Sequence, residues 1–352
     1  MPAARTPRIV ALAAALALPL ALLSATPATA ATVGVATWAD LRAAFLVDGD
    51  TVRLDANITG VANEPLLIEA GENIILDLNG FTLSITNPGT DNAAISVPAT
   101  ASLTINATNG GTLTATGGYS GAGIGGDEGS ASGTITINRG IINARGGFNA
   151  AGIGGGDGVG GNGGTTILNG GTITARGGPN SVGIGGGFSR LPGVLHVNGT
   201  PDAGAATDGG GSGSSVAAIT NPTTPPGVGY SATSSSSLGS GTLVVRFNYL
   251  VTFDTNGGSA DPADQTINDG DSLTTPAAPT REGFEFAGWT SGGSTYDFAT
   301  PITAPLTLSA AWTAVLAATG TDVTSALGLG ALLIASGVIL IALRRLVAKH
   351  SA

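Results

Sequence analysis

Apolar and polar residues alternate in short segments that recur along the middle of the chain at a step of about thirty residues. In a strand, alternation with a period of two places every second side chain on the same face. Recurrence at this step without helical spacing is typical of a solenoid, in which each repeat forms one rung. We expect the first strand of the rungs at residues 103–105, 135–137, 166–168 and 195–197, the second at 113–115, 142–144 and 173–175, and the third at 93–97, 122–124, 151–153 and 182–184.

Two repeated positions set the register of the rungs. The segment Gly-Ile-Gly-Gly occurs three times, which places Ile124, Ile153 and Ile184 at nearly equal steps along the chain. An asparagine follows the first strand of each rung, at Asn106, Asn138, Asn169 and Asn198, and we expect Asn79 to begin this series. Because an amide both donates and accepts, a column of asparagines, which we expect to point inward, can bond from rung to rung. The alternative is that these side chains bind a sugar ligand.

The repeats and the segment before them carry a family resemblance. The opening Trp38-Ala39-Asp40-Leu41, the phrase from Ile74 to Phe81 and the repeats that follow resemble the right-handed parallel β-helix of the pectin-lyase-like superfamily. We assign residues 31–200 to this domain. A solenoid exposes an apolar end that needs a cover. We expect that cover from a short helix over residues 37–45, since Thr37 can cap it and its apolar residues share one face.

The chain changes character after the repeats. Gly, Ser, Thr and Pro dominate residues 201–245, which we interpret as a linker. Residues 246–315 then combine the strand and turn from Val251 to Gly258 with two aromatic-rich segments. They resemble one Listeria-Bacteroides repeat, the internalin-B repeat module, and this resemblance implies a small β-grasp-like fold. We expect its core from six aromatic residues, namely Phe253, Phe284, Phe286, Trp289, Phe298 and Trp312.

The N-terminus carries the pattern of a secretory signal peptide. Basic residues precede an apolar run, and Ala28, Ala30 and Ala31 supply small side chains around a cleavage point after Ala30. The apolar run is shorter than the roughly 20 residues that a transmembrane helix needs. We therefore predict that residues 1–30 are removed and that the protein is exported.

The C-terminus resembles the cell-wall sorting signal of Gram-positive surface proteins. Residues 316–352 begin with Leu316, Ala317, Ala318, Thr319 and Gly320, continue with an apolar segment, 323–343, that is long enough to be a transmembrane helix, and end in a basic tail that favours the cytoplasmic side. The resemblance implies that a sortase cleaves after Thr319 and joins it to peptidoglycan, so that the membrane holds only the precursor.

One residue departs from the commonest sorting motif. Ala317 stands where that motif has proline, and the resulting Leu-Ala-X-Thr-Gly looks like the version used by a sortase class found in actinobacteria. The alternative for the whole segment is a plain single-span membrane protein in which the pentapeptide has no role.

Composition excludes several classes of function. Only 10% of the residues are charged, the formal net charge is −10, and five of the 13 basic residues lie in the two terminal segments that processing would remove. Nucleic acid and anionic membrane surfaces would repel such a chain. Cysteine is absent, which excludes disulfides, thiolate catalysis and cysteine zinc sites.

The candidate ligand-binding residues are the outward positions of the rungs. Thr104, Thr114, Thr136, Asn143 and Thr174 present hydroxyl and amide groups at rung spacing, and Arg145 and Arg176 occupy matching places in successive repeats. Two stacked guanidinium groups can hold a carboxylate of an acidic glycan. The alternative is a solvated arginine ladder without a ligand.

No catalytic constellation, cofactor motif or metal site is evident. His196 takes an outward position alone, and Asp127, Glu128 and Asp157 lie in glycine-rich loops without the repeated acidic spacing of a calcium site. We therefore predict an all-β, extracellular, wall-anchored surface protein that is not an enzyme and that acts in adhesion or glycan binding. The alternatives are a polysaccharide lyase or hydrolase and a purely structural wall component.

Overall fold

The computed structural model describes residues 31–203, 205–206, 209, 217–237 and 240–315. The predicted signal peptide, with Ala28 and Ala30, and the predicted sorting signal, with Leu316, Ala317, Ala318, Thr319, Gly320 and the membrane segment 323–343, lie outside these residues. Ala31 is described and exposed, directly before the first strand. Within the described part of the chain, no helix is long and apolar enough to span a membrane.

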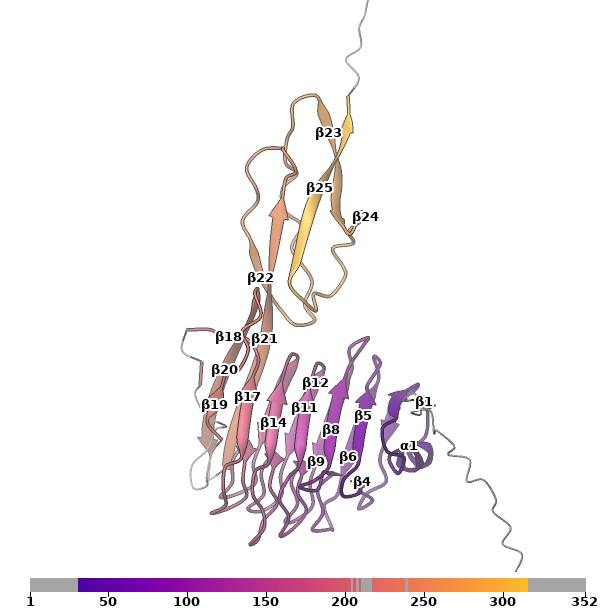
Figure 1. Ribbon diagram of the computed structural model, residues 1–352, viewed down its shortest axis with the longest axis vertical. Helices are drawn as coiled ribbons and strands as arrows, with labels where there is room; N and C mark the ends of the chain where they lie inside the picture. Colours follow the sequence, from indigo (N-terminus) through magenta and orange to yellow (C-terminus); the bar gives the residue numbers. More distant parts are fainter. Residues whose placement is uncertain (1–30, 204, 207–208, 210–216, 238–239, 316–352) are drawn as a thin grey trace, which may run out of the picture.

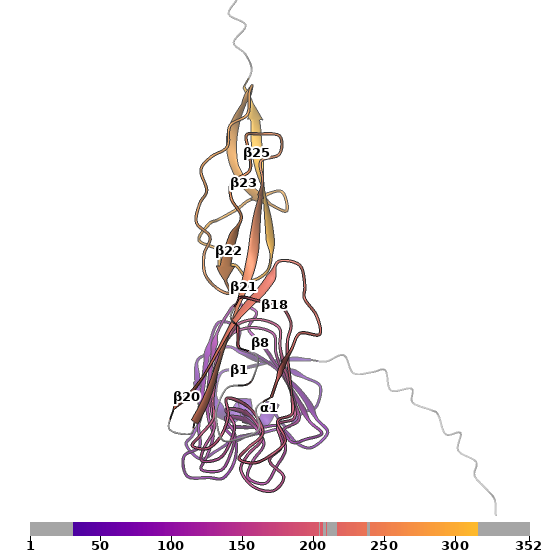
Figure 2. The same cartoon turned by 90° about the vertical axis from the view of Figure 1, so that its left-hand side faces the viewer.

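The first part of the molecule is a right-handed parallel β-solenoid, as the periodicity predicted for the solenoid and the family resemblance implied for its hand. Its rungs stack along a horizontal axis in Figure 1, and Figure 2 looks along that stack. Sheet A contains β1 (Thr32–Val35), β2 (Thr51–Leu54), β5 (Asn73–Asp77), β8 (Ser102–Asn106), β11 (Thr134–Ile137), β14 (Thr165–Leu168), β17 (Val194–Val197) and β19 (Ile219–Thr220).

The other two walls of the solenoid are also built from stacked parallel strands. Sheet B contains β3 (Ile58–Thr59), β6 (Thr82–Thr86), β9 (Thr112–Thr116), β12 (Ile141–Arg145) and β15 (Thr172–Arg176). Sheet C contains the two-residue strands β4 (Leu66–Leu67), β7 (Ile95–Ser96), β10 (Ile124–Gly125), β13 (Ile153–Gly154) and β16 (Ile184–Gly185). The chain passes through sheets A, B and C in each turn, so equivalent positions of successive repeats become neighbours.

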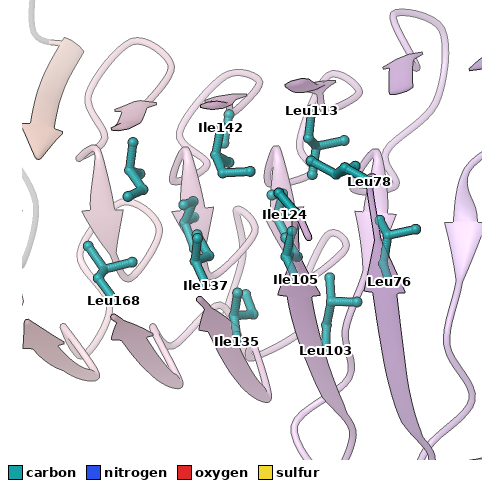
Figure 3. Close-up of a cluster of buried hydrophobic side chains, with 14 of the residues drawn as sticks. Leu76, Leu78, Leu103, Ile105, Leu113, Ile124, Ile135, Ile137, Ile142 and Leu168 are labelled. Atoms are coloured by element: carbon teal, nitrogen blue, oxygen red, sulfur yellow. The ribbon is translucent and has the colours of Figure 1, made fainter. Parts of the chain in front are cut away.

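The core is a set of apolar columns between the three sheets (Figure 3). Ile124 pairs with Ile153, and Ile153 pairs with Ile184, and all three are at most 1% exposed. The inward residues of sheets A and B, such as Ile137 and Ile142, are fully buried. Full burial of one such side chain contributes about 1.5–3 kcal/mol, so repetition of the column supplies the main stabilisation of the solenoid.

Glycine is required where one rung turns from sheet B to sheet C. A Cβ on Gly147 would lie 1.8 Å from the carbonyl oxygen of Gly118, and a Cβ on Gly178 would lie 1.6 Å from that of Gly147. These distances leave no room for any side chain. The repeated Gly-Gly pairs therefore reflect direct backbone contact between successive rungs.

The predicted helix covers the first rung. Helix α1 (Trp38–Ala44) begins after Thr37, whose hydroxyl accepts a hydrogen bond from the Asp40 amide at 3.2 Å. Leu41 and Phe45 are fully buried against the end of the solenoid. The helix prediction is confirmed, and its physical role is to cover apolar surface that no further rung covers.

The segment interpreted as a linker, 201–245, is instead largely folded. Strand β18 (Thr200–Pro201) pairs with β20 (Val228–Ser237), and β20 forms a long antiparallel hairpin with β21 (Ser240–Asp254). Strand β21 also pairs antiparallel with β15 and so closes sheet B. Tyr230, Leu243, Val245 and Phe247 are buried along this hairpin. The segment is polar in composition, but the alternating residues Leu243, Val245 and Phe247 of β21 and Tyr230 of β20 add to the buried core at the last rung.

The second part of the molecule is a small module that continues from β21. The far half of β21 pairs with β22 (Gln265–Asn268) and with β25 (Leu306–Ala314), and β25 pairs with β23 (Phe284–Ser291), which adds β24 (Ser294–Thr295). One strand thus belongs to both parts. The module stands beside the last rungs and points away from the stacking axis (Figures 1 and 2).

The aromatic core predicted for the module is present with one exception. Phe253 and Trp289 are buried, and Phe286, Phe298 and Trp312 pack against them. Phe284 is 37% exposed and lies under the Arg281 guanidinium, 4.2 Å from it. It sits at the free end of β23, beyond the buried part of the sheet, and forms a cation–π contact there.

Candidate functional site

The predicted ligand surface divides between two faces of the solenoid. Thr104 and Thr136 are register partners on sheet A. The other five predicted residues, Thr114, Asn143, Thr174, Arg145 and Arg176, lie on sheet B. The two groups were predicted on the first and second strands of the rungs, and each turn of the chain places those strands on different walls.

The outer face of sheet B carries three columns of side chains. Thr114, Asn143 and Thr174 form the middle column, which is half-buried. Thr112, Ile141 and Thr172 form the column at the start of the strands, and Thr116, Arg145 and Arg176 form the column at their ends. Neighbouring members of a column lie on adjacent strands about 4.8 Å apart, so their polar groups can contact one extended ligand.

The arginines on this face have no acidic partner in the described part of the chain. Arg145 and Arg176 are exposed register partners, and Arg246 on β21 faces Thr172. Strands β3, β6, β9, β12 and β15 and residues 240–246 contain no Asp or Glu. Two guanidinium groups on adjacent strands repel each other, and an anion placed between them removes that repulsion. The face therefore favours a negatively charged ligand.

Arg246 was not among the predicted site residues. Its signal was available, because Arg246 belongs to an alternating run from Thr242 to Phe247. The run was overlooked because it follows a tract of serines and glycines. Only the antiparallel pairing of β21 with β15 places Arg246 on the same face as the other two arginines.

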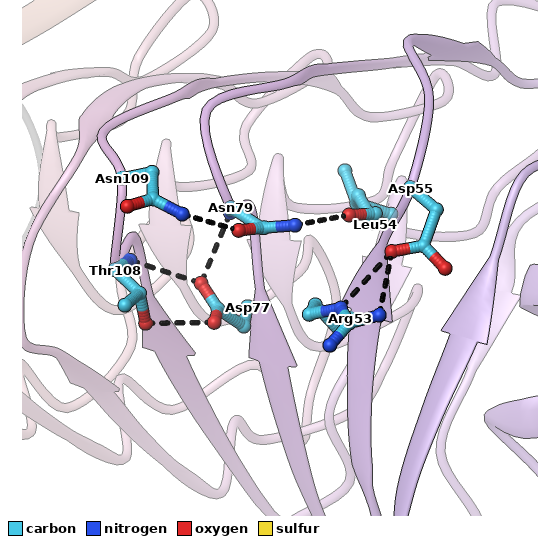
Figure 4. Close-up of polar contacts among 7 residues, drawn as sticks. All are labelled: Arg53, Leu54, Asp55, Asp77, Asn79, Thr108 and Asn109. Carbon is cyan, nitrogen blue, oxygen red and sulfur yellow. Dashed lines mark hydrogen bonds and ion pairs between the residues drawn. The ribbon is translucent and has the colours of Figure 1, made fainter.

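Sheet A presents its charges differently. Arg53 on β2 is held by Asp55, with Nη2 2.9 Å and Nε 3.0 Å from Oδ1 (Figure 4). The hydrogen bond and the charge of Asp55 raise the pKa of the Arg53 guanidinium, and the charge of Asp77 adds to this effect. The outward arginine of sheet A is thus already neutralised by its own sheet, which makes sheet B the better anion-binding face.

The asparagine column exists, but its side chains are not inward. Nδ2 of Asn138 donates to Oδ1 of Asn106 at 2.8 Å, Asn169 donates to Asn138 at 2.6 Å, and Asn198 donates to Asn169 at 2.6 Å. All four are half-buried or exposed at the turn from sheet A to sheet B. Each asparagine directly follows an inward residue of the preceding strand, so the alternation of the strand turns its side chain outward. The column therefore stabilises the outer edge of the stack.

Asn79 does not begin this column. The register partner of Asn106 is Asp77, whose carboxylate accepts hydrogen bonds from the Thr108 amide at 3.0 Å and its hydroxyl at 2.7 Å. Asn79 instead donates to the Leu54 carbonyl and accepts from Asn109 (Figure 4). The step from Asn79 to Asn106 is shorter than the later steps of the series, and this difference was the sign that Asn79 is out of register.

The acidic residues of the glycine-rich loops serve the loops themselves. Asp127 accepts from the Ala93 amide at 2.7 Å and from the Ser96 hydroxyl at 2.8 Å. Asp157 accepts from the Gly158 amide at 2.7 Å. Among the described residues, no three His, Asp or Glu side chains gather into a group suited to a metal ion. His196 lies on sheet A, with Nδ1 2.7 Å from the Thr220 hydroxyl.

An exposed aromatic pair was also missed by sequence reasoning. Tyr119 and Phe148 occupy the turns from sheet B to sheet C on successive rungs, stacked with ring centroids 5.7 Å apart and planes 11° apart. They are 63% and 39% exposed. The step from Tyr119 to Phe148 equals the step from Ile124 to Ile153, and this equal spacing was the available signal.

Comparisons with known proteins identify both parts of the molecule at the level of repeats. The model of the Listeria-Bacteroides repeat domain matches residues 249–311. The model of the beta helix repeat matches residues 109–130, 135–157 and 167–188, which correspond to successive rungs. No curated protein and no solved structure matches the chain. The two repeat types are consistent with a surface protein or with a carbohydrate-binding or carbohydrate-degrading role.

Proposed function

We propose that this protein is a secreted surface protein that binds an acidic polysaccharide through the outer face of sheet B. The observation that carries the proposal is the column of Arg145 and Arg176, with Arg246 beside Thr172 at the other end of the same face, on strands that contain no acid. Because these strands carry no acidic residue, their guanidinium groups present local positive charge to carboxylate groups, although the chain as a whole has a net charge of −10. The hydroxyl and amide groups of Thr114, Asn143 and Thr174 supply hydrogen bonds to sugar hydroxyls.

We further propose that the protein is held at the cell wall. The support is the order of the C-terminal residues: the pentapeptide from Leu316 to Gly320, an apolar segment of membrane-spanning length, and a basic tail. In this proposal a sortase joins Thr319 to peptidoglycan, and the signal peptide directs export. The test is release of the protein by wall-digesting enzymes from cells with the natural sequence, and its loss to the medium or membrane when Thr319→Ala is introduced.

The binding proposal is tested with a panel of immobilised polysaccharides. We expect polyuronates such as polygalacturonate, alginate and hyaluronan to bind, and neutral polymers such as dextran to bind less. The double variant Arg145→Gln, Arg176→Gln should lose about tenfold or more in affinity, because each lost charge-assisted contact is worth on the order of 1.5–3 kcal/mol. Equal binding by the protein and this variant would overturn the proposal.

The control for the arginine variant is Arg53→Gln on sheet A. This change also removes one positive charge, but from a guanidinium that Asp55 already occupies. It should leave polysaccharide binding unchanged. The same incubations report on catalysis, since a polysaccharide lyase would generate unsaturated products; we propose binding without cleavage, and steady product formation would contradict that part.

A further inference from the structure

A cleft of about 460 Å³ lies where the module meets the solenoid. One wall consists of the turns that join sheet A to sheet B, residues 108–111 and 139–141, and the other consists of residues 269–270 and 300–303 of the module. A volume of this size is within the range of small-molecule sites, which occur preferentially between domains. The cleft adjoins the outer face of sheet B through Ile141 and Thr172.

Two ionisable side chains from opposite walls meet in the cleft. Nε of Arg139 is 3.5 Å from Oδ1 of Asp269, and Nη2 of Arg139 donates to the Thr303 carbonyl. The Asp269 side chain is 8% exposed, and neither its Oδ1 nor Nε of Arg139 has a hydrogen-bond partner among the described residues. Buried polar atoms without hydrogen bonds are costly. The two atoms are enclosed and face each other across the junction, so a ligand in the cleft lies against the exposed remainder of the Arg139 side chain, which is 26% exposed.

Burial also changes the protonation of the groups beside the cleft. It raises the pKa of Asp269, an effect that the positive charge of Arg139 and a hydrogen bond from Tyr249 oppose. Burial likewise raises the pKa of Tyr249, and the charge of Asp269 adds to the rise. The Tyr249 hydroxyl therefore stays neutral at ordinary pH. Both groups experience the low polarity of an enclosed site.

The cleft opens directly onto the outer face of sheet B. Ile141 and Thr172, which line it, are the first residues of β12 and β15. Asn143 and Thr174 come next on the outer face, and Arg145 and Arg176 end the same strands. Four residues of strand span about 13 Å. The cleft and the arginine pair therefore lie at the two ends of one polar track, and the module residues Asp269, Gly270, Thr300, Pro301 and Thr303 stand at the cleft end.

We propose that the cleft binds the terminal sugar unit of the acidic polysaccharide, so that the protein recognises chain ends rather than chain interiors. This inference rests on the proposed function. The partly exposed Arg139 guanidinium donates to an oxygen of the end unit, and the enclosed Asp269 carboxylate holds that guanidinium in place. Ile141 and Pro301 pack against the C–H groups of the ring, and the carboxylates of the following units reach Arg145 and Arg176.

The experiment uses hexagalacturonate in three forms: with both ends free, with the reducing end coupled to a linker, and with the non-reducing end blocked. We expect blocking one particular end to weaken binding about tenfold or more in calorimetry, while blocking the other end has little effect. Asp269→Asn should weaken binding of the free hexamer to the level of the blocked one. Asp271→Asn is the matched control, because Asp271 is exposed and lies outside the cleft.

A second variant distinguishes loss of the cleft as a binding site from a change in the contact between the module and the solenoid. Thr172→Phe fills the cleft from the side of sheet B and leaves Arg139 and Asp269 unsubstituted, and it should reduce binding in the same way. Its control is Thr82→Phe, the equivalent outward position on β6. Thermal unfolding of each variant shows whether it remains folded.

The two proposals fail in different ways. If all three hexamers bind equally, and Asp269→Asn and Thr172→Phe bind as the natural protein does, the cleft only joins the two parts and the inference is overturned while the proposed function stands. If no form of the hexamer and no polyuronate of the panel binds, both proposals are wrong.

Discussion

The outer faces of sheets A and B are built from the same repeat, yet they differ in how their charges are satisfied. On sheet A, Arg53 is paired with Asp55, and Asp77 is bound to Thr108. On sheet B, Arg145, Arg176 and Arg246 face outward from strands without acids. In a solenoid, a residue type that recurs at the same register position of successive rungs forms a column. A binding face therefore arises by changing which residue is repeated, with no change in the fold.

The largest expected effect is on the core that both sheets share. Ile137 on sheet A and Ile142 on sheet B are fully buried, and replacing either with Ala should lower the free energy of unfolding by about 2–5 kcal/mol. Urea denaturation measures this loss. Thr136→Ala, an outward change on the same strand as Ile137, should have little effect. A large difference between the two isoleucine variants would show that the sheets are stabilised separately.

A smaller effect is expected at the turn that joins the two sheets. Asn138 donates to Asn106 and accepts from Asn169, so Asn138→Ala removes two hydrogen bonds and should cost about 1–2 kcal/mol in unfolding free energy. Asn109→Ala removes the one bond to Asn79 and should cost about half as much. If the two variants lose the same unfolding free energy in urea denaturation, the second hydrogen bond of Asn138 adds no stability.

The contact between Asp269 and Arg139 beside sheet B should make the free energy of unfolding depend on pH, and we expect no such contribution from sheet A. The pKa of Asp269 is raised by burial, so the folded protein binds this proton more tightly than the unfolded chain does. The stability that Asp269 contributes is complete below the ordinary pKa of 3.8 and is lost as the pH rises through the raised pKa. Asp269→Asn should remove this decline in thermal unfolding curves measured between pH 3 and pH 7.

Asp261 provides a control of opposite sign. Hydrogen bonds from the Thr255 amide and hydroxyl lower the pKa of Asp261. Its contribution to stability is therefore present above the ordinary carboxyl pKa and is lost as the pH falls through the lowered pKa. Asp261→Asn should weaken the protein at neutral pH more than at acidic pH. If both variants changed the pH profile in the same direction, the assignment of Asp269 would be wrong.

The smallest expected effect is weak polyuronate binding by sheet A after its ion pair is removed. Asp55→Asn frees Arg53 from its ion pair and leaves one uncompensated guanidinium on that face. Weak, salt-sensitive binding of polyuronate should appear in the variant that also lacks Arg145 and Arg176, because exposed charges are screened as ionic strength rises. No gain over the arginine variant would show that a single free arginine is insufficient and that the column is required.

Some of this organisation was readable from the sequence. The rungs, the three strands of each rung and the alignment of Ile124, Ile153 and Ile184 follow from a repeat that each turn of chain encodes locally. Helix α1 was likewise predicted from its cap and its apolar face. Arg145 and Arg176 were placed together for the same reason, since equal spacing in a solenoid means contact in space.

The remaining features depend on contacts that no local pattern encodes. The sequence determined the stacked rungs and the columns on them, because a periodic chain meets the same environment at every turn. Tertiary structure alone decided that β21 closes sheet B and carries Arg246 to it, and that Asp269 meets Arg139 across a cleft. These arrangements arise where the repeat ends, and there the partner of each residue is set by packing between distant segments.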